Sequence, residues 1–397
     1  MMRSHTPFPS SQPAGAVLLA LALLAVAWGI VGAGSANADK RSVTVMTQNL
    51  YQGTEFAHIR ALVGGPPPSQ AEVLKATTED YATYQATRFK DRAKQIAGEI
   101  AQNSPALVGL QEVATWHKGA FDPAHPFALP PAVSEDFTQV LIEALKADGM
   151  EYQAVSATAR PEGNFTLAFP VISGAPPFGL TAVGMVERGV ILARSDLPPG
   201  QLKLSNPQSG TYSCEFCKVT LENPVTKETI PFTDSWESID VKLRGKTFRF
   251  ITTHLDALEP SGVVRFLQAK ELLEGPANTT LPMVLTGDLN GGPKTPPSGT
   301  GPAAYDELIG GGLSDTWVAA GLGAPPLTCC HLPFEDLVND PNAEFGAGQE
   351  LDHVLTRGAF TVLDEHLVGD KVPTPKPEPF IWPSDHAGMV STLELGP

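Results

Sequence analysis

The chain has 397 residues, of which 42% are apolar, so it can bury a sizeable core in one large domain or two small ones. Its 43 acidic residues outnumber 27 Lys and Arg, and a formal net charge of −16 disfavours loose binding to polyphosphate backbones. A nuclease is not excluded, because a local basic groove or a bound metal can offset that charge. The 37 Pro and 37 Gly predict long and numerous loops.

The N-terminal segment has the composition of an export signal. Arg3 supplies a positive start, residues 15–33 carry no charge, and residues 36–38 (Ala-Asn-Ala) form a small-x-small cleavage site. We expect residues 1–38 to be a cleaved signal peptide and residues 39–397 to be a secreted or extracytoplasmic domain, whose charge is then 26 − 43 = −17. The alternative is an uncleaved N-terminal membrane anchor, because the apolar run is near spanning length.

The four cysteines are expected to form disulfides. A zinc site made by the four cysteines needs four thiolates that converge tetrahedrally, which two adjacent cysteines fit poorly. A redox-active Cys-x-x-Cys needs a thioredoxin-like βαβ context, which the sequence does not show. Disulfides are the usual state of cysteines after export. Four cysteines allow three pairings, among which the sequence does not choose. These residues are Cys214, Cys217, Cys329 and Cys330.

From residue 42 onward the chain has an α/β pattern with many strands. Short β-branched or apolar runs predict strands at 42–48, 106–110, 189–193, 238–243, 247–253, 282–286, 351–355 and 387–394. Apolar residues at helical spacing predict helices at 85–102, 135–147 and 262–274. Segments rich in Gly or Pro predict loops at 64–70, 122–131, 292–302 and 371–383. No period recurs and no loop marks a domain boundary, so we expect one domain with two packed β-sheets and helices outside.

Polar residues stand at the ends of these apolar strands, where a scaffold ends and a site can begin. Alone, a Gly-Asp-x-Asn is usually a turn, and a Ser-Asp-His is usually a helix cap or loop. Here several such elements occur together, each beside a predicted strand, and this joint occurrence favours a site. The residues are Asn49, Glu112, His254, Asp288, Asn290, Asp352, Asp385 and His386.

These residue types suit metal-assisted proton transfer. Asp288 and Asn290 are two residues apart, so on extended chain they point the same way toward a common substrate. The set also offers hard oxygen donors, which suit Mg²⁺, Mn²⁺ or Ca²⁺. Two histidines can move protons near neutral pH, and Asp352 could fix the tautomer of one of them.

In this order the elements resemble the motif set of the endonuclease/exonuclease/phosphatase superfamily, whose fold is that of deoxyribonuclease I. The resemblance spans about residues 43–394. It implies a four-layer α/β sandwich, with two packed mixed β-sheets flanked by helices, and a metal-dependent attack of water on phosphorus. The matching motifs are Asn49, Leu110-Gln111-Glu112-Val113, Thr253-His254-Leu255, Gly287-Asp288-Leu289-Asn290, Asp352 and Ser384-Asp385-His386.

The resemblance also assigns metal ligands. Glu112 is similar to the family's main ligand, with Asn49 nearby, and Asp385 is a further candidate. Mg²⁺ is the expected ion, with Mn²⁺ or Ca²⁺ as alternatives. Since Mg²⁺ usually keeps some of its waters, few protein ligands are needed.

Proton-transfer roles follow from the same resemblance. His386 is the expected base, oriented by Asp352, and Asp288 is its rival for the water's proton. Asp288 and Asn290 would hold the phosphate and that water. His254 resembles the second histidine of the nuclease and sphingomyelinase branches, which stabilises or protonates the leaving oxygen.

Three further residues are assigned less directly. Glu187 sits where the nuclease branch keeps a carboxylate partner for that second histidine, although a plain surface Glu is the alternative. Arg188 could contact phosphate instead. His353 departs from the family, where an aromatic or aliphatic residue is commoner, and we interpret it as structural.

The substrate is left open. Residues 164–185 are uncharged and rich in Phe, Pro and Gly, which fits either packing on the sandwich or an apolar lip that touches lipid or a membrane surface. Residues 205–212 form a predicted polar loop that could touch substrate, and no Lys/Arg cluster marks a polynucleotide groove. Three hypotheses remain: a secreted phosphodiesterase for a lipid or small phosphodiester, a DNase-like nuclease, and a catalytically silent binding protein. No obligate protein partner is evident.

Overall fold

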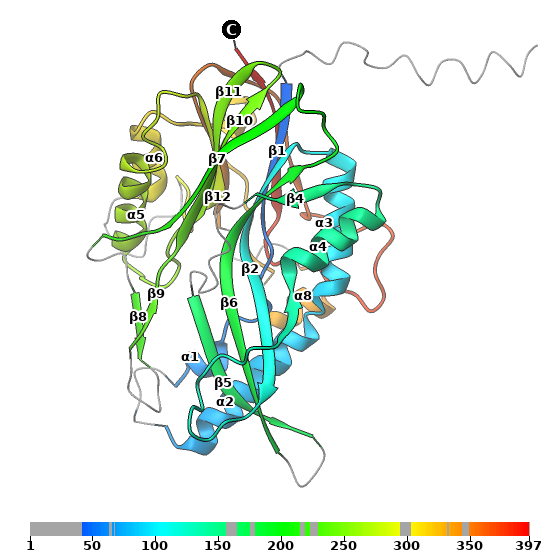
Figure 1. Cartoon of the computed structure of the whole chain (residues 1–397), viewed down its shortest axis with the longest axis vertical. Coiled ribbons are helices and arrows are strands. Elements are labelled where there is room, and N and C mark those ends of the chain that lie inside the picture. Colours follow the sequence, from blue (N-terminus) through cyan, green and yellow to red (C-terminus); the bar gives the residue numbers. More distant parts are fainter. Residues whose placement is uncertain are drawn as a thin grey trace, which may run out of the picture. The chain divides into compact units, whose positions relative to one another are not determined.

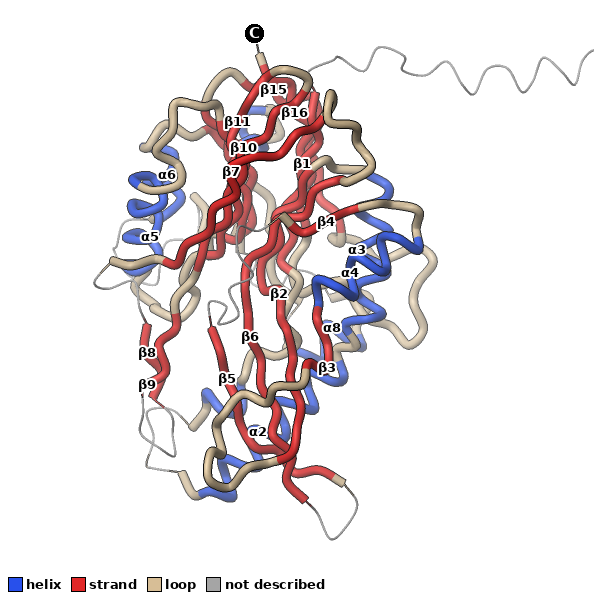
Figure 2. Tube along the Cα trace, in the orientation of Figure 1, coloured by secondary structure: helices blue, strands red, loops and turns tan. Residues whose placement is uncertain are grey.

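Two mixed β-sheets lie against each other, and helices cover their outer faces (Figures 1 and 2). The computed structural model describes residues 42–62, 66, 68–155, 165–174, 179–214, 219–222, 229–293, 303–331, 333–343 and 349–396. The predicted signal peptide, residues 1–38, lies outside these ranges. No helix in the described ranges is long and apolar enough to cross a membrane.

The first sheet has the strand order β15-β16-β1-β2-β6-β4, with β3 added to β2 and β5 added to β6. Its pair β1 and β2 is parallel, and its other pairs are antiparallel. The bounds are β1 Ser42–Asn49, β2 Leu107–Ala120, β3 Val133–Asp136, β4 Tyr152–Ala154, β5 Phe165–Ser173, β6 Gly179–Arg194, β15 Phe360–Val368 and β16 Gly388–Leu395.

The second sheet has the strand order β13-β14-β12-β11-β10-β7, and its one parallel pair is β11 and β12. The bounds are β7 Leu202–Thr211, β10 Ser235–Leu243, β11 Lys246–His254, β12 Met283–Asp288, β13 Ser314–Asp315 and β14 Asp352–Arg357. A separate two-stranded sheet pairs β8 Val219–Glu222 with β9 Thr229–Phe232.

Three apolar layers hold the sandwich together. Between the sheets, Val45 of β1 belongs to one buried cluster with Phe250 of β11. On the outer face of the first sheet, Ile96 and Leu141 pack from helices, and Leu272 packs on the second sheet. The helices are α1 Ala57–Arg60, α2 Gln70–Ala86, α3 Phe89–Asn103, α4 Phe137–Ala147, α5 Val263–Glu274, α6 Ala304–Gly310, α7 Thr316–Ala319 and α8 Phe334–Asn339. The predicted four-layer α/β sandwich is therefore confirmed.

The helix predicted at 85–102 begins too early. Arg88 has a left-handed backbone with φ 41°, which separates α2 from α3. Helix α2 was missed because its buried face includes polar residues such as Thr77 and Asp80, so its apolar periodicity is weak. A capping box between Ser69 and Glu72 begins α2, and that box is the sequence signal for it.

Two segments for which we predicted a loop or an apolar lip contain strands instead. The polar loop expected at 205–212 was wrong, because Leu202–Thr211 is β7, the edge strand that pairs with β10. Its polar side chains and Pro207 suit an edge, where unpaired backbone faces water. In the apolar segment 164–185, β5 pairs with the first part of β6 from Phe165↔Glu187 to Ser173↔Gly179. Residues 175–178 lie outside the described ranges.

The expected disulfides are present where the cysteines are described. Cys329 and Cys330 are bonded to each other, and Cys214 is also disulfide-bonded. Cys217 lies outside the described ranges. The adjacent pair matters below because it lies beside the candidate site.

Glu365 of β15 provides a test of packing between the sheet and α7. Its carboxylate is buried and accepts hydrogen bonds from Ser391 Oγ at 2.9 Å and Thr316 Oγ1 at 3.1 Å. Burial raises the pKa of Glu365 to about 8, although these hydrogen bonds lower it. The folded state therefore favours the protonated acid, so its stabilising contribution is lost as pH rises from the ordinary value of 4.5 through about 8.

We expect Glu365→Gln to remove this pH dependence. The amide keeps the acceptor oxygen and never ionises, so the variant should be more stable than the parent at pH 8 by on the order of 2 kcal/mol. Urea unfolding at pH 5 and pH 8 measures the difference. An equal loss of stability in both proteins between these pH values would contradict the assignment.

Candidate active site

Strand ends from both sheets lie close together around one pocket, which His254 and Asp288 line, whereas Asn49 and Asp352 are not among its lining residues. In the second sheet, His254, Asp288 and Asp352 are register neighbours across β11, β12 and β14. In the first sheet, Asn49 ends β1 opposite Gln111 of β2. The sheets thus bring residues far apart in sequence to the same edge.

Unusual backbone conformations occur at Glu112, Asn290 and Gly287, and they set the direction of the site side chains. Glu112 has φ 53° and lies in a β-bulge, where two residues of β2 face one of β6. Asn290 has φ 48°, which is uncommon for a residue with a side chain. A Cβ at Gly287, whose φ is 152°, would overlap the carbonyl oxygen of Thr253. The Gly-Asp-x-Asn motif therefore needs its glycine for close packing between β11 and β12.

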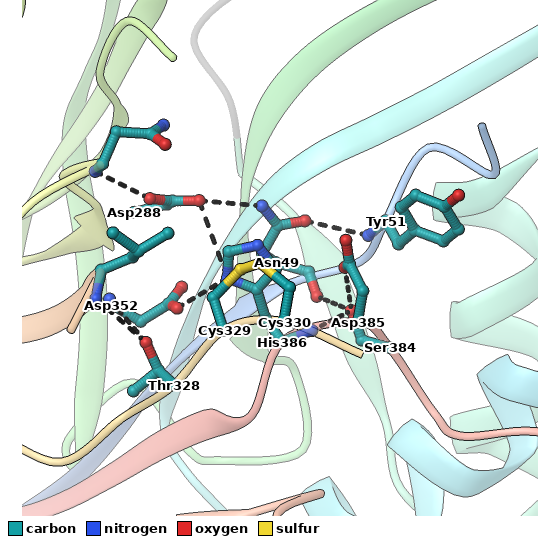
Figure 3. Close-up of a disulfide and its surroundings, with 12 residues drawn as sticks. Asn49, Tyr51, Asp288, Thr328, Cys329, Cys330, Asp352, Ser384, Asp385 and His386 are labelled. Atoms are coloured by element: carbon teal, nitrogen blue, oxygen red, sulfur yellow. Dashed lines mark hydrogen bonds and ion pairs between the residues drawn. A yellow bond between two sulfur atoms is a disulfide. The ribbon is translucent and has the colours of Figure 1, made fainter. Parts of the chain in front are cut away.

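Asn49 joins the carboxylates of the two sheets. Its Nδ2 donates to Glu112 Oε1 at 3.0 Å. The same Nδ2 donates to Asp288 Oδ2 at 3.0 Å, and Asn49 Oδ1 accepts from Tyr51 N at 2.9 Å (Figure 3). The second oxygen of Glu112 accepts from Gln52 N at 3.0 Å. Two acidic groups thus converge on one amide.

His386 and Asp352 form a buried acid–base pair. His386 Nδ1 lies 2.7 Å from Asp352 Oδ2 and 3.8 Å from Asp288 Oδ2 (Figure 3). Burial alone lowers the pKa of His386, but the carboxylates of Asp352, Asp385 and Asp288 outweigh burial and raise that pKa well above 6.5. The contact fixes the ring orientation, because Nδ1 holds the proton that Asp352 accepts.

The Ser-Asp-His motif is tied to the end of β1. Ser384 Oγ donates to the carbonyl of Asn49 at 2.7 Å. Gln48 Nε2 donates to the same carbonyl at 2.8 Å and to the carbonyl of His386 at 3.3 Å. Asp385, the middle residue of the motif, lines the pocket, and burial raises the pKa of its carboxyl to about 7. These bonds fix the register of the two segments.

His254 lines the same pocket as His386. Its Nε2 lies 3.0 Å from Asn290 Nδ2 and 3.6 Å from Asp288 Oδ2. Burial lowers its pKa, but Asp288, Glu112 and further carboxylates outweigh this and raise the pKa of His254 to about 9. An amide N–H at 3.0 Å fits an unprotonated Nε2, whereas the carboxylates favour the charged ring. A cation bound at Glu112 would offset some of that negative charge and lower the pKa.

Asp234 also lines the pocket, although no motif in the sequence marks it as a site residue. It is buried beside His254, raises the pKa of that histidine, and accepts from Gln268 Nε2 at 2.8 Å. Glu187 lines the same pocket and raises the same pKa, and its role as the partner of His254 stays a prediction. Arg188 instead donates to Thr115 Oγ1 at 3.1 Å. No sequence motif surrounds Asp234, so the sequence gives no sign that Asp234 lies close to His254.

We expect Asp234→Asn to lower the pKa of His254 below about 9, because one of the carboxylates that stabilises the charged ring is removed. An NMR titration of the histidine ring protons measures this value. Glu259→Gln is a matched control: Glu259 precedes α5 and does not line the pocket. Unchanged titration of His254 in Asp234→Asn would contradict the pairing.

Arg92 is a second residue that no sequence motif marks, and it supports the backbone next to the site. This buried guanidinium donates to the carbonyls of Leu50 at 2.5 Å, Tyr51 at 3.0 Å and Pro383 at 3.3 Å. Burial lowers the pKa of Arg92 to about 10, while nearby acids including Asp385 raise it. Arg92 therefore joins two segments by hydrogen bonds: the one that follows Asn49 and the one that precedes the Ser-Asp-His motif.

The pocket has a volume of about 310 Å³ and is lined by two chemically different sets of residues. One set is acidic and accompanies His254 and His386: Glu55, Glu112, Glu187, Asp234, Asp288 and Asp385. The other set, called the apolar arm below, consists of Phe56, Ile59, Val73, Phe127, Leu167, Phe169, Phe232 and Leu258, most of which belong to one apolar cluster. The excess of hard oxygen donors over cations in the acidic set fits a divalent cation.

Two further histidines have contacts of their own. His353 is buried, and its Nδ1 lies 3.1 Å from Asp315 Oδ2, which agrees with a structural role. His331 is buried and stacks on Trp382 with ring centroids 4.0 Å apart. Neither residue lines the pocket.

Residues 46–386 match the model of the Endonuclease/Exonuclease/phosphatase family. A solved structure of an endonuclease/exonuclease/phosphatase family protein from Leptotrichia buccalis C-1013-b is similar, with a TM-score of 0.51 and 14% identity over 89% of this chain and 100% of that chain. No curated protein matches the chain.

Two further solved structures are similar over most of the chain. The single-strand DNA product complex of D. rerio TDP2 has a TM-score of 0.47 and 15% identity, over 89% of this chain and 99% of that chain. The mannosyl-6-phosphatase Bt3783 of Bacteroides thetaiotaomicron VPI-5482 has a TM-score of 0.48 and 17% identity, over 88% of this chain and 99% of that chain.

The chain belongs to the Endonuclease/Exonuclease/phosphatase family, because the family model covers most of its length and the fold agrees. Members of this family are hydrolases that act on phosphoester bonds. The described residues also contain a group, Asp288, Asp352 and His386, whose ligand atoms are close enough to hold a metal ion.

Proposed function

We propose that this protein is a secreted, divalent-metal-dependent phosphodiesterase that acts on a lipid or another phosphodiester carrying an apolar group. The observation that supports the proposal is that one pocket is lined both by the acidic residues and by the apolar arm. A phosphodiester with one apolar substituent would place its phosphate among the acidic residues and its substituent along the arm.

The metal would be held by Glu112, with Asn49 and Asp385 nearby. Their oxygens are hard donors of the kind that Mg²⁺ prefers, and Mn²⁺ or Ca²⁺ are alternatives. When bound, the cation supplies positive charge that polarises the phosphoryl group. The cation also offsets repulsion between the substrate and the pocket's carboxylates, which would otherwise oppose binding of an anion.

Proton transfer is assigned to the two histidines. His386 would take a proton from the attacking water, since Asp352 fixes its ring at 2.7 Å. His254 would protonate or stabilise the leaving oxygen, with Glu187 and Asp234 sustaining its positive charge. Asn290 and Asp288 would position the phosphate and the water.

A metal-supplemented substrate panel tests the proposal. The protein is offered bis-p-nitrophenyl phosphate, phospholipid vesicles and plasmid DNA, each with Mg²⁺, Mn²⁺ or Ca²⁺. We expect hydrolysis of the first two and release of a phosphorylated or free headgroup from the vesicles. Nicking of the plasmid with no action on vesicles would instead support the DNase-like alternative. Failure on every substrate would support a silent binding protein.

The apolar arm has its own prediction. Phe169→Ser places a hydroxyl in the arm, so KM for an apolar phosphodiester should rise about tenfold, in keeping with the loss of one buried aromatic contact. The KM for bis-p-nitrophenyl phosphate should change less. Val133→Ser, at an exposed site on β3, is the control. Equal effects on both substrates would contradict a role of the arm in substrate choice.

Secretion is part of the proposal and rests on residues 1–38. N-terminal sequencing of protein recovered from the medium should begin at Asp39. Retention of the whole chain in the membrane fraction would favour the anchor. A transient contact of the β5–β6 region with a membrane surface is expected only for a lipid substrate, and vesicle sedimentation measures that contact.

A further inference from the structure

The adjacent cysteines form one wall of the candidate active site. Cys329 and Cys330 line the pocket together with His386, and they lie beside its ring in Figure 3. Both sulfur atoms and one ring nitrogen of His386 lie within 4.8 Å of one another. Nothing in the proposed hydrolysis uses the cysteines, so their place beside the base calls for an explanation.

The backbone fixes the cysteine pair to the segment that carries the base. Cys329 forms a β-bridge with His386, and the carbonyl of Thr328 accepts from Ala387 N at 2.8 Å. On the other side, Thr328 Oγ1 accepts from the backbone N–H of Asp352 at 3.0 Å (Figure 3). The cysteines are thus held in register with both members of the buried acid–base pair.

The donor set depends on the state of the sulfur atoms. In the disulfide the sulfurs are bonded to each other and offer no thiolate. After reduction, two thiolates and one imidazole nitrogen share a small volume. Two Cys and one His are the ligands that a soft or borderline cation such as Zn²⁺ prefers, and they differ from the oxygen donors at Glu112.

We propose that reduction of the Cys329–Cys330 disulfide creates a binding site for Zn²⁺ or a similar soft cation, with His386 as the third ligand, and that this cation inhibits the enzyme. The inhibitory part rests on the proposed function, whereas the binding part does not. Nδ1 of His386 is held by Asp352, and Nε2 is its remaining site of proton uptake. A metal on either nitrogen removes the ring from catalysis.

A dithiol can reduce the Cys329–Cys330 disulfide in two exchange steps. One thiolate of the dithiol attacks Sγ of Cys330, which is less buried than Cys329, so that a mixed disulfide forms and Cys329 leaves as a thiolate. The second thiol of the reductant then attacks the mixed disulfide and becomes its own cyclic disulfide, and Cys330 is released. Two electrons reach the protein, and Zn²⁺ then binds both sulfurs as thiolates, displacing any protons they have gained.

The experiment compares oxidised and reduced protein in saturating Mg²⁺. The full chain is treated with a phosphine reductant, which becomes the phosphine oxide, and is then titrated with Zn²⁺. Bound zinc per chain is measured after gel filtration, and Cd²⁺ replaces Zn²⁺ in a second titration to reveal the thiolate charge-transfer band. We expect one additional zinc ion per chain after reduction and at least a tenfold loss of hydrolysis, reversed by a chelator.

Variants locate the ion. Cys330→Ser should lose the additional zinc and the charge-transfer band, and His386→Ala should bind zinc at least tenfold more weakly. The double variant Cys214→Ser, Cys217→Ser should behave like the parent, because Cys214 does not line the pocket. Circular dichroism confirms that the reduced chain keeps its fold.

Several results would overturn the inference. These are the absence of additional zinc after reduction, zinc binding that survives in Cys330→Ser, equal binding in His386→Ala, and loss of the fold on reduction. The zinc count does not depend on activity. A protein that binds zinc as expected but hydrolyses nothing when oxidised would therefore refute the proposed function and leave the metal site standing.

Discussion

Replacing His386 by Ala is expected to lower kcat/KM for bis-p-nitrophenyl phosphate by about a thousandfold, because the water loses its general base. The fold should persist, since the neighbouring Ser384 and Gln48 keep their bonds to the carbonyl of Asn49. Steady-state kinetics with saturating metal measures the effect. His117→Ala is the control, because His117 contacts the carbonyl of Pro130 and does not line the pocket. A loss below tenfold in His386→Ala would remove this residue from the mechanism.

The pH profile separates a base from a residue that only supports the structure. Asp352 raises the pKa of His386, so Asp352→Asn should lower that pKa and move the acidic limb of the kcat/KM profile to lower pH. The plateau rate should fall as well, because the ring loses the group that orients it. A fall in rate with an unchanged limb would indicate that the limb belongs to another group.

Replacing Glu112 by Gln is expected to abolish tight metal binding and to lower metal-dependent hydrolysis at least a hundredfold. The amide has nearly the same shape and keeps one oxygen for Asn49 Nδ2 or Gln52 N, but it lacks the charge that a hard cation needs. Calorimetric titration with Mg²⁺ or Mn²⁺ measures the affinity directly.

Glu55→Gln is the matched control for this prediction. Glu55 lines the same pocket and accepts from the hydroxyl of Tyr51 at 2.6 Å, but it does not contact Asn49. Metal affinity in Glu55→Gln should stay within a few-fold of the parent. Equal metal affinity in Glu112→Gln and the parent would show that the cation is held elsewhere.

The sandwich and the strand ends of the site could be predicted because they depend on local pattern. The runs before His254 and Asp288 are short and consist largely of β-branched or apolar residues, as expected of strands between two layers, and a polar residue after each run marks the edge. The family resemblance then placed these edges together. The structure agrees, since His254, Asp288 and Asp352 are register neighbours.

The missed features depend on contacts far apart in sequence. Asp234 ends no apolar strand, and its nearness to His254 arises from the pairing of β10 with β11. Arg92 looks like an ordinary charged residue of a helix, yet it is fully buried, and four backbone carbonyls accept its hydrogen bonds. The adjacent cysteines reach His386 through a β-bridge between segments more than fifty residues apart. No local sequence pattern predicts such long-range contacts.

The most direct test of the central claim is hydrolysis of bis-p-nitrophenyl phosphate by metal-stripped protein during titration with Mg²⁺. We expect no hydrolysis in a chelator, full recovery with Mg²⁺ in the parent, and no recovery in Glu112→Gln or His386→Ala. Activity that persists in the chelator, or that returns equally in both variants, would contradict a metal-dependent phosphoesterase centred on Glu112 and His386.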